Sequence, residues 1–302
     1  MNEISKEILE KYQIRKTRKQ KNAFIGFLRA HFPDLRVEED AIGYSRNIVI
    51  GNPDTAKAVF GAHYDTCAVM PFPNFIMPKS VTVSILYAFV LAIPMAIIAS
   101  VIGNAAGWIF GDPSLAGLFT LLTYWVVLFL MILGPANKHT VNDNTSGVIT
   151  LIELMDSMTE EERAQSCFVF FDNEEKGLLG SSVFNKEHKN VMKEKLLINF
   201  DCVSDGDYIM LIPDKKSFPE LSEKLEAAFV NAGDKTVLIE SAKFVYYPSD
   251  QKNFKKNIGV AAFKKSKLGL YMDRIHTPRD TVMDERNIEV LVSGMKNFLS
   301  GI

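Results

Sequence analysis

The stretch CFVFFDNEEKGLLGS, residues 167–181, decides the fold and raises the question of function. It begins with a run of β-forming residues, 167–171, which predicts a buried strand. The strand passes directly into four polar residues, three of them acidic: Asp172, Asn173, Glu174 and Glu175. Adjacent glutamates repel each other, so a pair placed at the end of a buried strand calls for a compensating positive charge.

The same alternation of strand and helix runs through most of the chain. Further strands are predicted at 47–51, 57–62, 196–200, 208–212, 237–240 and 260–263. Helices are predicted at 3–31 (as one or two helices), 145–158, 177–188, 218–232 and 285–299. This order predicts an α/β fold, a three-layer sandwich around a mainly parallel mixed sheet.

One region, residues 80–134, differs from the rest of the chain in composition. It carries a single charged residue, Asp112, and contains two apolar segments, 81–103 and 115–134. A membrane-spanning helix needs about 20 apolar residues, and Pro94 is tolerable in such a helix. We therefore expect an inserted transmembrane helical hairpin at 80–134, within a single domain formed by 1–79 and 135–302. A hydrophobic lid or dimerisation arm on a soluble protein is the alternative.

Charge and cysteine content exclude several classes of protein. The formal net charge of the 302 residues is −2, which argues against a general nucleic-acid binder. The basic run 15–21 is either a solvated helix face or a contact with an anionic surface.

The three cysteines are odd in number and widely spaced, so no disulfide framework is expected and a reducing compartment suits them. The N-terminus has no apolar core, so no signal peptide is expected.

Histidines and carboxylates follow the predicted strands at the point where each strand ends. In an open α/β sheet such positions line the ligand crevice. Each residue alone has an ordinary explanation as a helix cap or turn former, but together they favour a metal site. Imidazole and carboxylate ligands suit zinc, and cobalt or manganese would also accept them. The residues are His63, Asp65, Asp143, Glu174, Glu175, Asp201 and His276.

The number of candidate ligands suggests two ions. A single catalytic zinc usually takes three protein ligands, and a carboxylate that bridges two ions would account for the surplus. One glutamate of the Glu174-Glu175 pair can then bind metal while the other stays free as a general base. The bound cations would offset the repulsion between the two.

In this order and spacing the residues resemble the M28 family of zinc peptidases, which are mainly aminopeptidases. The resemblance is carried by the segments His63-Tyr64-Asp65, Asp143-Asn144-Thr145-Ser146-Gly147, Glu174-Glu175, Asp201 and His276-Thr277-Pro278. The segment 249–254 also looks like a Ser-Asp-His-x-x-Phe motif of that family, with Gln251 where histidine is common. The resemblance covers roughly 45–66 and 140–300.

The resemblance implies a role for each residue. His63 and Asp201 would bind one zinc ion, Glu175 and His276 a second, and Asp143 would bridge the two. Asp65 would accept the other ring N–H of His63 and so fix its orientation. Glu174 would be the general base that takes a proton from metal-activated water. Tyr246 or Tyr247 would assist the oxyanion.

The chain departs from the family between its first two motifs. In soluble members a short loop would join the positions of His63 and Asp143, whereas here the hydrophobic hairpin fills most of that interval. The expected function is therefore a membrane-anchored di-zinc aminopeptidase that removes N-terminal residues from peptides. A glutaminyl-cyclase-like acyltransferase with one zinc is an alternative, and so is a non-enzymatic receptor or scaffold on a peptidase fold.

The charges that flank the hairpin predict its orientation. Lys79 precedes the first apolar segment and Lys138 follows the second, while the connecting loop, roughly 104–114, has no cation. Because cytoplasmic flanks are rich in Lys and Arg, we expect two spans with the catalytic domain in the cytoplasm. The expected partners are a peptide substrate and, through 81–134, the lipid bilayer. The sequence does not indicate an oligomeric state.

Overall fold

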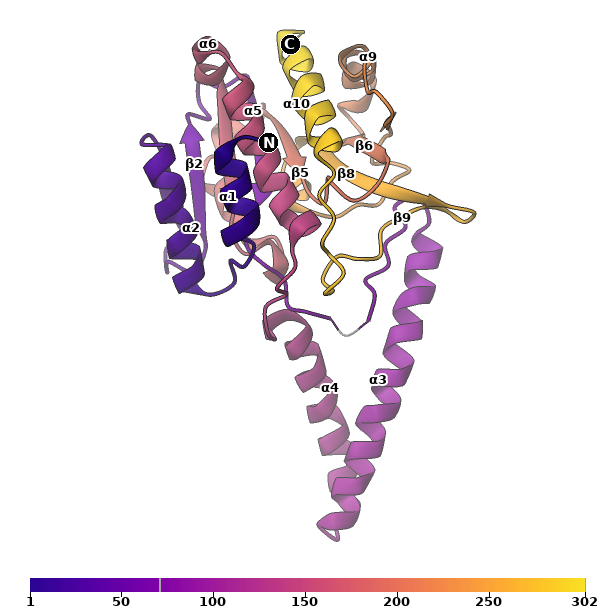
Figure 1. Ribbon diagram of the computed structural model, residues 1–302. Coiled ribbons are helices and arrows are strands. Elements are labelled where there is room, and N and C mark those ends of the chain that lie inside the picture. Colours follow the sequence, from indigo (N-terminus) through magenta and orange to yellow (C-terminus); the bar gives the residue numbers. More distant parts are fainter. Residues whose placement is uncertain (71, 302) are drawn as a thin grey trace.

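The chain forms an α/β domain from which a long helical hairpin projects (Figure 1), as seen in a computed structural model that describes residues 1–70 and 72–301. The predicted fold class, an α/β sandwich with an inserted apolar hairpin, is confirmed. Strands that precede the hairpin pair with strands that follow it, so both parts of the chain build one sheet.

Within the described ranges the sheet has nine strands, eight of them in the order β1-β2-β4-β3-β5-β8-β6-β7, and β9 pairs with β8. The four strands at its centre, β4, β3, β5 and β8, are mutually parallel, whereas pairing at both flanks includes antiparallel strands. The strands are β1 (Arg36–Glu39), β2 (Arg46–Gly51), β3 (Ala58–His63), β4 (Ser166–Phe171), β5 (Leu196–Phe200), β6 (Tyr208–Pro213), β7 (Thr236–Ile239), β8 (Lys256–Ser266) and β9 (Gly269–Tyr271).

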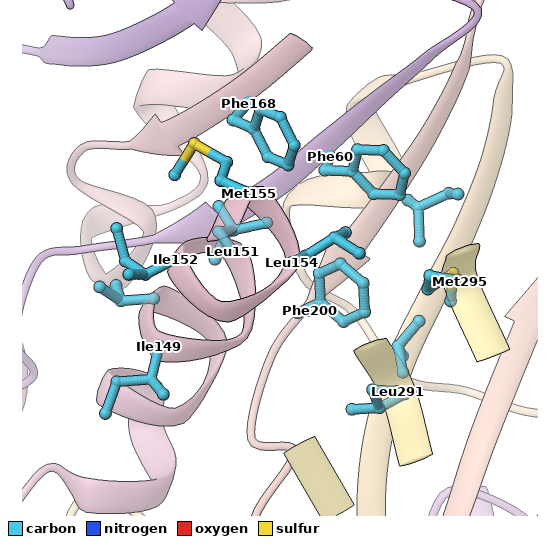
Figure 2. Close-up of a cluster of buried hydrophobic side chains, with 14 of the residues drawn as sticks. Phe60, Ile149, Leu151, Ile152, Leu154, Met155, Phe168, Phe200, Leu291 and Met295 are labelled. Carbon is cyan, nitrogen blue, oxygen red and sulfur yellow. The ribbon is translucent and has the colours of Figure 1, made fainter. Parts of the chain in front are cut away.

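Helices cover both faces of this sheet because successive side chains of a strand point to opposite faces. In β4, Phe168 and Phe170 lie in the larger core with Leu151 of α5 and Leu291 of α10 (Figure 2), while Phe171 lies in a second core with Phe184 of α7. The first face carries α1 (Glu3–Lys11), α2 (Arg18–His31), α5 (Gly147–Ser157), α9 (Phe218–Ala228) and α10 (Glu285–Ser300), and the second carries α7 (Leu179–Glu187) and α8 (Lys189–Met192).

The structure corrects several predicted boundaries and adds short elements. The region 3–31 forms two helices, the helix predicted to 232 ends at Ala228, and the strand predicted at 260–263 is the longer β8. The sequence pattern did not predict β1, β9 or α6 (Glu160–Ala164). The strand β1 is short and partly exposed, so its residues show no apolar alternation.

The hairpin consists of α3 (Val81–Ile109) and α4 (Leu115–Leu133), which are long and apolar enough to cross a membrane. Their most apolar windows are only 6% and 0% buried within the protein, so neither is a core helix of the α/β domain. The two helices approach each other closely at Gly103, where an added Cβ would lie 2.5 Å from the carbonyl oxygen of Ala116. From there they diverge toward the domain (Figure 1).

The basic run 15–21 is only partly solvated, because Arg15 and Lys21 are buried whereas Arg18 and Lys19 are exposed. Arg15 is fully buried, and its guanidinium donates to the carbonyl oxygens of Tyr12 and Tyr64. Lys21 is buried against Asp172. These two cations therefore hold the N-terminal helices on the domain.

Candidate metal centre

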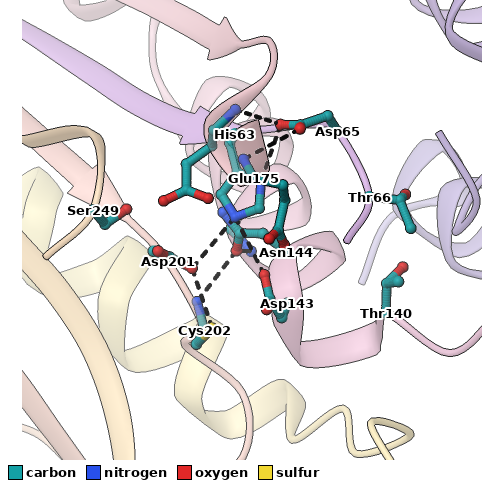
Figure 3. A network of polar contacts seen from close by, with 12 residues as sticks. His63, Asp65, Thr66, Thr140, Asp143, Asn144, Glu175, Asp201, Cys202 and Ser249 are labelled. Carbon is teal, nitrogen blue, oxygen red and sulfur yellow. Dashed lines mark hydrogen bonds and ion pairs between the residues drawn. The ribbon is translucent and has the colours of Figure 1, made fainter. Parts of the chain in front are cut away.

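The predicted ligands converge at the carboxyl ends of the parallel strands (Figure 3). His63 is the last residue of β3, and Asp201 directly follows β5. Glu174 and Glu175 begin a short 3-10 helix after β4. Asp143 lies in the turn that precedes α5, and His276 lies in the loop after β9.

Asp143 lies between the two histidines. Its Oδ1 is 3.2 Å from Nε2 of His63, and its Oδ2 is 3.0 Å from Nε2 of His276. The same His63 nitrogen is 3.6 Å from Oδ1 of Asp201, and the same His276 nitrogen is 3.3 Å from Oε2 of Glu175. The two oxygens of one carboxylate thus face two separate groups of ligands.

The donor atoms of these groups lie close enough to hold metal ions. In one group, His63, Asp143 and Asp201 each offer a ligand atom within 4.8 Å of the others, and a second group contains Asp143, Glu175 and His276. Oε1 of Glu175 is buried without a hydrogen-bond partner among the described residues. An unpartnered buried carboxylate oxygen is costly unless a cation pairs with it, so the donor set fits bound metal.

The negative charge of the centre raises the pKa of both histidines. Burial lowers the pKa of His63, but the adjacent carboxylates of Asp143, Asp201 and Asp65 outweigh it, so its pKa lies well above the usual value. For His276 burial is likewise outweighed by Glu175 and Asp143. The surrounding carboxylates thus favour positive charge at both imidazoles, and a bound cation would compete with protons for these positions.

Asp65 holds the turn that carries the two glutamates. Its carboxylate accepts the backbone N–H of Glu174 at 2.9 Å and that of Glu175 at 3.3 Å. Its Oδ1 is also 3.5 Å from Nδ1 of His63, which makes an ion-pair contact but not a hydrogen bond. The contact expected for orienting His63 is therefore long, and the closer role of Asp65 is to fix the glutamate turn.

Glu174 lies beside His63 and Glu175, with a carboxylate oxygen within 4.8 Å of their ligand atoms. Burial raises its pKa well above the usual value, and the nearby Glu175, Asp250 and Asp201 raise it further against the opposing effect of His63. A carboxylate with a raised pKa is a stronger base than an ordinary one, which suits a general base.

The two tyrosines differ in their relation to the centre. Tyr247 lines the pocket of about 170 Å³ that contains the ligands, and its hydroxyl donates to the carbonyl oxygen of Asp201 at 3.2 Å. Tyr246 is 53% exposed, does not line that pocket, and lies against Lys252. Of the two, only Tyr247 is within reach of the centre in this conformation.

Three further acidic or thiol side chains at the centre were not singled out from the sequence. Asp280 accepts the backbone N–H groups of Asn142 and Asp143, at 2.7 and 3.0 Å, and so holds the turn of the shared carboxylate. Asp250 is buried, and burial raises its pKa to about 7. Cys67 has its sulfur within 4.8 Å of the ligand atoms of the His276 group.

Gln251, which stands where the resembling motif has histidine, serves the surrounding structure. Its Oε1 accepts from Asn199 of β5 at 3.0 Å, and its Nε2 donates to the carbonyl oxygen of Tyr247 at 2.7 Å. Both polar atoms of its side chain are therefore engaged in hydrogen bonds to neighbouring segments. The histidine-to-glutamine difference therefore leaves the donor set intact.

Comparisons with known proteins place this geometry in context. The model of Peptidase family M28 matches residues 129–295, which is more than half of the chain. No curated protein matches the sequence. Similar solved structures include a Porphyromonas gingivalis glutaminyl cyclase, with a TM-score of 0.58 and 15% identity over 99% of this chain and 95% of that one.

Two other similar structures are described as an aminopeptidase and an exopeptidase. The Legionella pneumophila LapA aminopeptidase has a TM-score of 0.55 and 13% identity, covering 98% of this chain and 69% of that one. A Zn-dependent exopeptidase from Parabacteroides distasonis has a TM-score of 0.54 and 14% identity, over 99% and 94% of the two chains. At this level of identity these likenesses concern the fold.

Proposed function

Because the chain belongs to peptidase family M28, we propose that it is a two-zinc aminopeptidase held at a membrane by α3 and α4. The observation that carries the proposal is the position of Asp143, whose two carboxylate oxygens face His63 on one side and His276 on the other. A carboxylate placed in this way can serve two ions at once, whereas a single ion would use only one of its two sides.

The chain's own residues would perform the remaining chemistry. Zinc supplies Lewis-acid polarisation of a carbonyl group and makes water more acidic near neutral pH. His63 and Asp201 would hold one ion, and Glu175 and His276 the other. Glu174 would take the proton of the attacking water and deliver it to the departing amine, a role for which its raised pKa suits it.

The small size of the pocket favours a substrate that is cleaved at the end of a peptide chain. Its volume of about 170 Å³ is below the ~300–1,000 Å³ of a typical small-molecule site. Ile76, Tyr247 and Ile275 contribute apolar surface to its wall. A space of this size suits a single terminal side chain better than a length of polypeptide that passes through the site.

The test combines metal analysis with substrates. Detergent-purified protein should bind two zinc ions per chain and release the fluorophore from aminoacyl substrates that have a free α-amine. N-acetylated versions of the same substrates are the matched control and should not react, because an aminopeptidase requires the free terminus. Cleavage of the blocked substrates would contradict the assignment as an aminopeptidase.

A glutaminyl-cyclase-like reaction is the second candidate, because the solved structures with a similar fold include two glutaminyl cyclases. It predicts one zinc per chain and release of ammonia from peptides with N-terminal glutamine. Metal titration that saturates at one ion, together with ammonia release, would favour it over the aminopeptidase. A non-enzymatic receptor would show neither reaction, and the presence of all five predicted ligands argues against it.

Anchoring by the hairpin is supported by the length, apolar composition and exposure of both helices. Two spans would return the chain to its starting side, and the flanking Lys79 and Lys138 favour a cytoplasmic domain. A Ser114→Cys variant should react with an impermeant thiol reagent added outside intact cells, whereas Lys216→Cys should not. The native cysteines are buried, so the unmodified protein serves as the background control. Reversed labelling would refute the predicted orientation. Release of the protein from membranes by carbonate washing would refute membrane anchoring by the hairpin.

A further inference from the structure

Cys67 lies in the second ligand group of the centre. Its Sγ and one ligand atom each of Asp143, Glu175 and His276 all lie within 4.8 Å of one another. The five ligands implied by the family resemblance do not include it. The His63 group, by contrast, consists of two carboxylates and one imidazole.

Backbone hydrogen bonds on both sides hold Cys67 in this position. Its carbonyl oxygen accepts from the N–H of Asn137 at 3.1 Å, and the side chain of Asn137 donates to the carbonyl oxygen of Thr277 at 3.0 Å. Three residues further on, the N–H of Met70 donates to the carbonyl oxygen of His276 at 2.7 Å. The segment that carries the thiol is thus tied directly to the segment that carries the histidine.

The thiol and a neighbouring carboxylate oxygen are both buried without hydrogen-bond partners among the described residues. Cys67 is only 1% exposed, and in the part of the chain that the structure describes its sulfur makes no hydrogen bond. Glu175, whose side chain is 10% exposed, has its Oε1 buried there without a partner. Cys202, on the other side of the centre, differs because its thiol already donates to Oδ1 of Asp201 at 3.1 Å. Two potential ligand atoms of the His276 group, Sγ of Cys67 and Oε1 of Glu175, therefore have no hydrogen-bond partner among residues 1–70 and 72–301.

We propose that the thiolate of Cys67 is a fourth protein ligand of the metal ion at the His276 site. Four protein ligands make a closed site, which is typical of structural zinc, whereas catalytic zinc keeps three ligands and an open position. The His63 site would keep three ligands and lies beside Glu174. The two sites would then differ in function, with a tightly held ion at His276 and the reactive position at His63.

The chemistry of sulfur gives the proposal a direct signature. Thiolate is a soft ligand that favours zinc and cobalt over manganese and magnesium. Cobalt bound to a thiolate shows an intense near-ultraviolet charge-transfer absorption, which oxygen and nitrogen ligands do not produce. The proposal rests on the metal site of the proposed function, but this absorption reports ligation whether or not the protein cleaves peptides.

The experiment is a cobalt titration of metal-free, detergent-purified full chain. The charge-transfer band should grow with the first equivalent of cobalt, because the closed site fills first. The band should be lost in Cys67→Ser. It should be retained in the matched control, Cys167→Ser, because Cys167 lies in the second hydrophobic core and not in a ligand group. Absence of the band in the unmodified protein, or its persistence in Cys67→Ser, would overturn the proposal.

A second measurement separates loss of ligation from loss of folding. Cys67→Ser should still bind cobalt at the His63 site and should weaken zinc binding at the other site by at least ~10-fold, the lower end of what outer partners of a metal site contribute. Unchanged affinity at both sites would also refute ligation by Cys67. If the unmodified protein shows the cobalt–thiolate band but cleaves no aminoacyl substrate, the ligation stands and the aminopeptidase proposal fails.

Discussion

Replacing Glu174 with glutamine removes one negative charge from the centre and preserves the shape of the side chain. The backbone should keep its position, because the N–H of residue 174 is held by Asp65 whatever the side chain is. Burial and the neighbouring acids raise the pKa of Glu174, so the native side chain is an unfavourable buried charge that the amide relieves. The thermal stability of metal-free Glu174→Gln should therefore equal or exceed that of the metal-free unmodified protein.

The rate should fall steeply, because the amide cannot accept the proton. General base catalysis contributes roughly 10²- to 10⁴-fold, which corresponds to about 3 to 5 kcal/mol in the activation free energy. The assay is the kcat of aminoacyl-substrate hydrolysis, with zinc content and melting temperature measured on the same preparation. Glu187→Gln, an exposed position at the end of α7, is the matched control and should leave all three unchanged.

Two results would refute this reasoning. Loss of zinc from Glu174→Gln would show that Glu174 is a ligand and that the roles of Glu174 and Glu175 are exchanged. Retention of both zinc and full kcat would show that another group, such as the buried Asp250, takes the proton.

Three further predictions concern other parts of the molecule. Asp280→Asn would place an amide N–H group against the backbone N–H groups of the turn before α5. Zinc affinity, measured by competition with a chelator, should therefore fall by about 10- to 100-fold. An affinity equal to that of the unmodified protein would show that the turn keeps its conformation without Asp280. The hydrogen bond to Glu38 raises the pKa of His188. The contact therefore stabilises the fold fully below about pH 6.5, and this stabilisation is lost as the pH rises through the raised pKa. Glu38→Gln should therefore lower the free energy of unfolding at pH 6 but not at pH 9, by less than ~1 kcal/mol because both side chains are partly exposed. Equal effects at both pH values would contradict the linkage. Gly103→Val should lower the free energy of unfolding in detergent by roughly 1–3 kcal/mol, because it forces α3 and α4 apart. Gly117→Val is the control, since a Cβ added at Gly117 meets nothing within 4 Å. Equal stability of the two variants would show that the helices do not pack at Gly103.

The sequence alone determined the elements and the chemistry of the centre, because both depend on local patterns. Short runs of β-forming residues marked the central strands, and long uncharged apolar runs marked α3 and α4. Polar residues at strand ends pointed to one edge of the sheet, because parallel strands direct their carboxyl ends to the same side. The donors His63, Glu175 and Asp201 therefore could be named before any fold was known.

Other features depended on contacts between distant segments, about which a local pattern carries no information. The strand β1 is short and half exposed, so only its pairing with β2 reveals it. Arg15 and Lys21 look like surface cations in the sequence, yet the packing of the N-terminal helices buries them. Tyr246 and Tyr247 are equivalent as neighbours in sequence, and only the course of the loop sends the second toward Asp201.

The clearest case is the centre itself. Asp143 faces both His63 and His276 because three segments far apart in the sequence meet at the end of the sheet. Cys67 joins them because its segment is hydrogen-bonded on one side to Asn137, which follows α4, and on the other, through Met70, to His276. Cys67 follows the His63-Tyr64-Asp65 segment by two residues. That spacing alone does not tell which side chains its thiol meets, so its closeness to Glu175 and His276 at the candidate metal centre is a property of the tertiary structure.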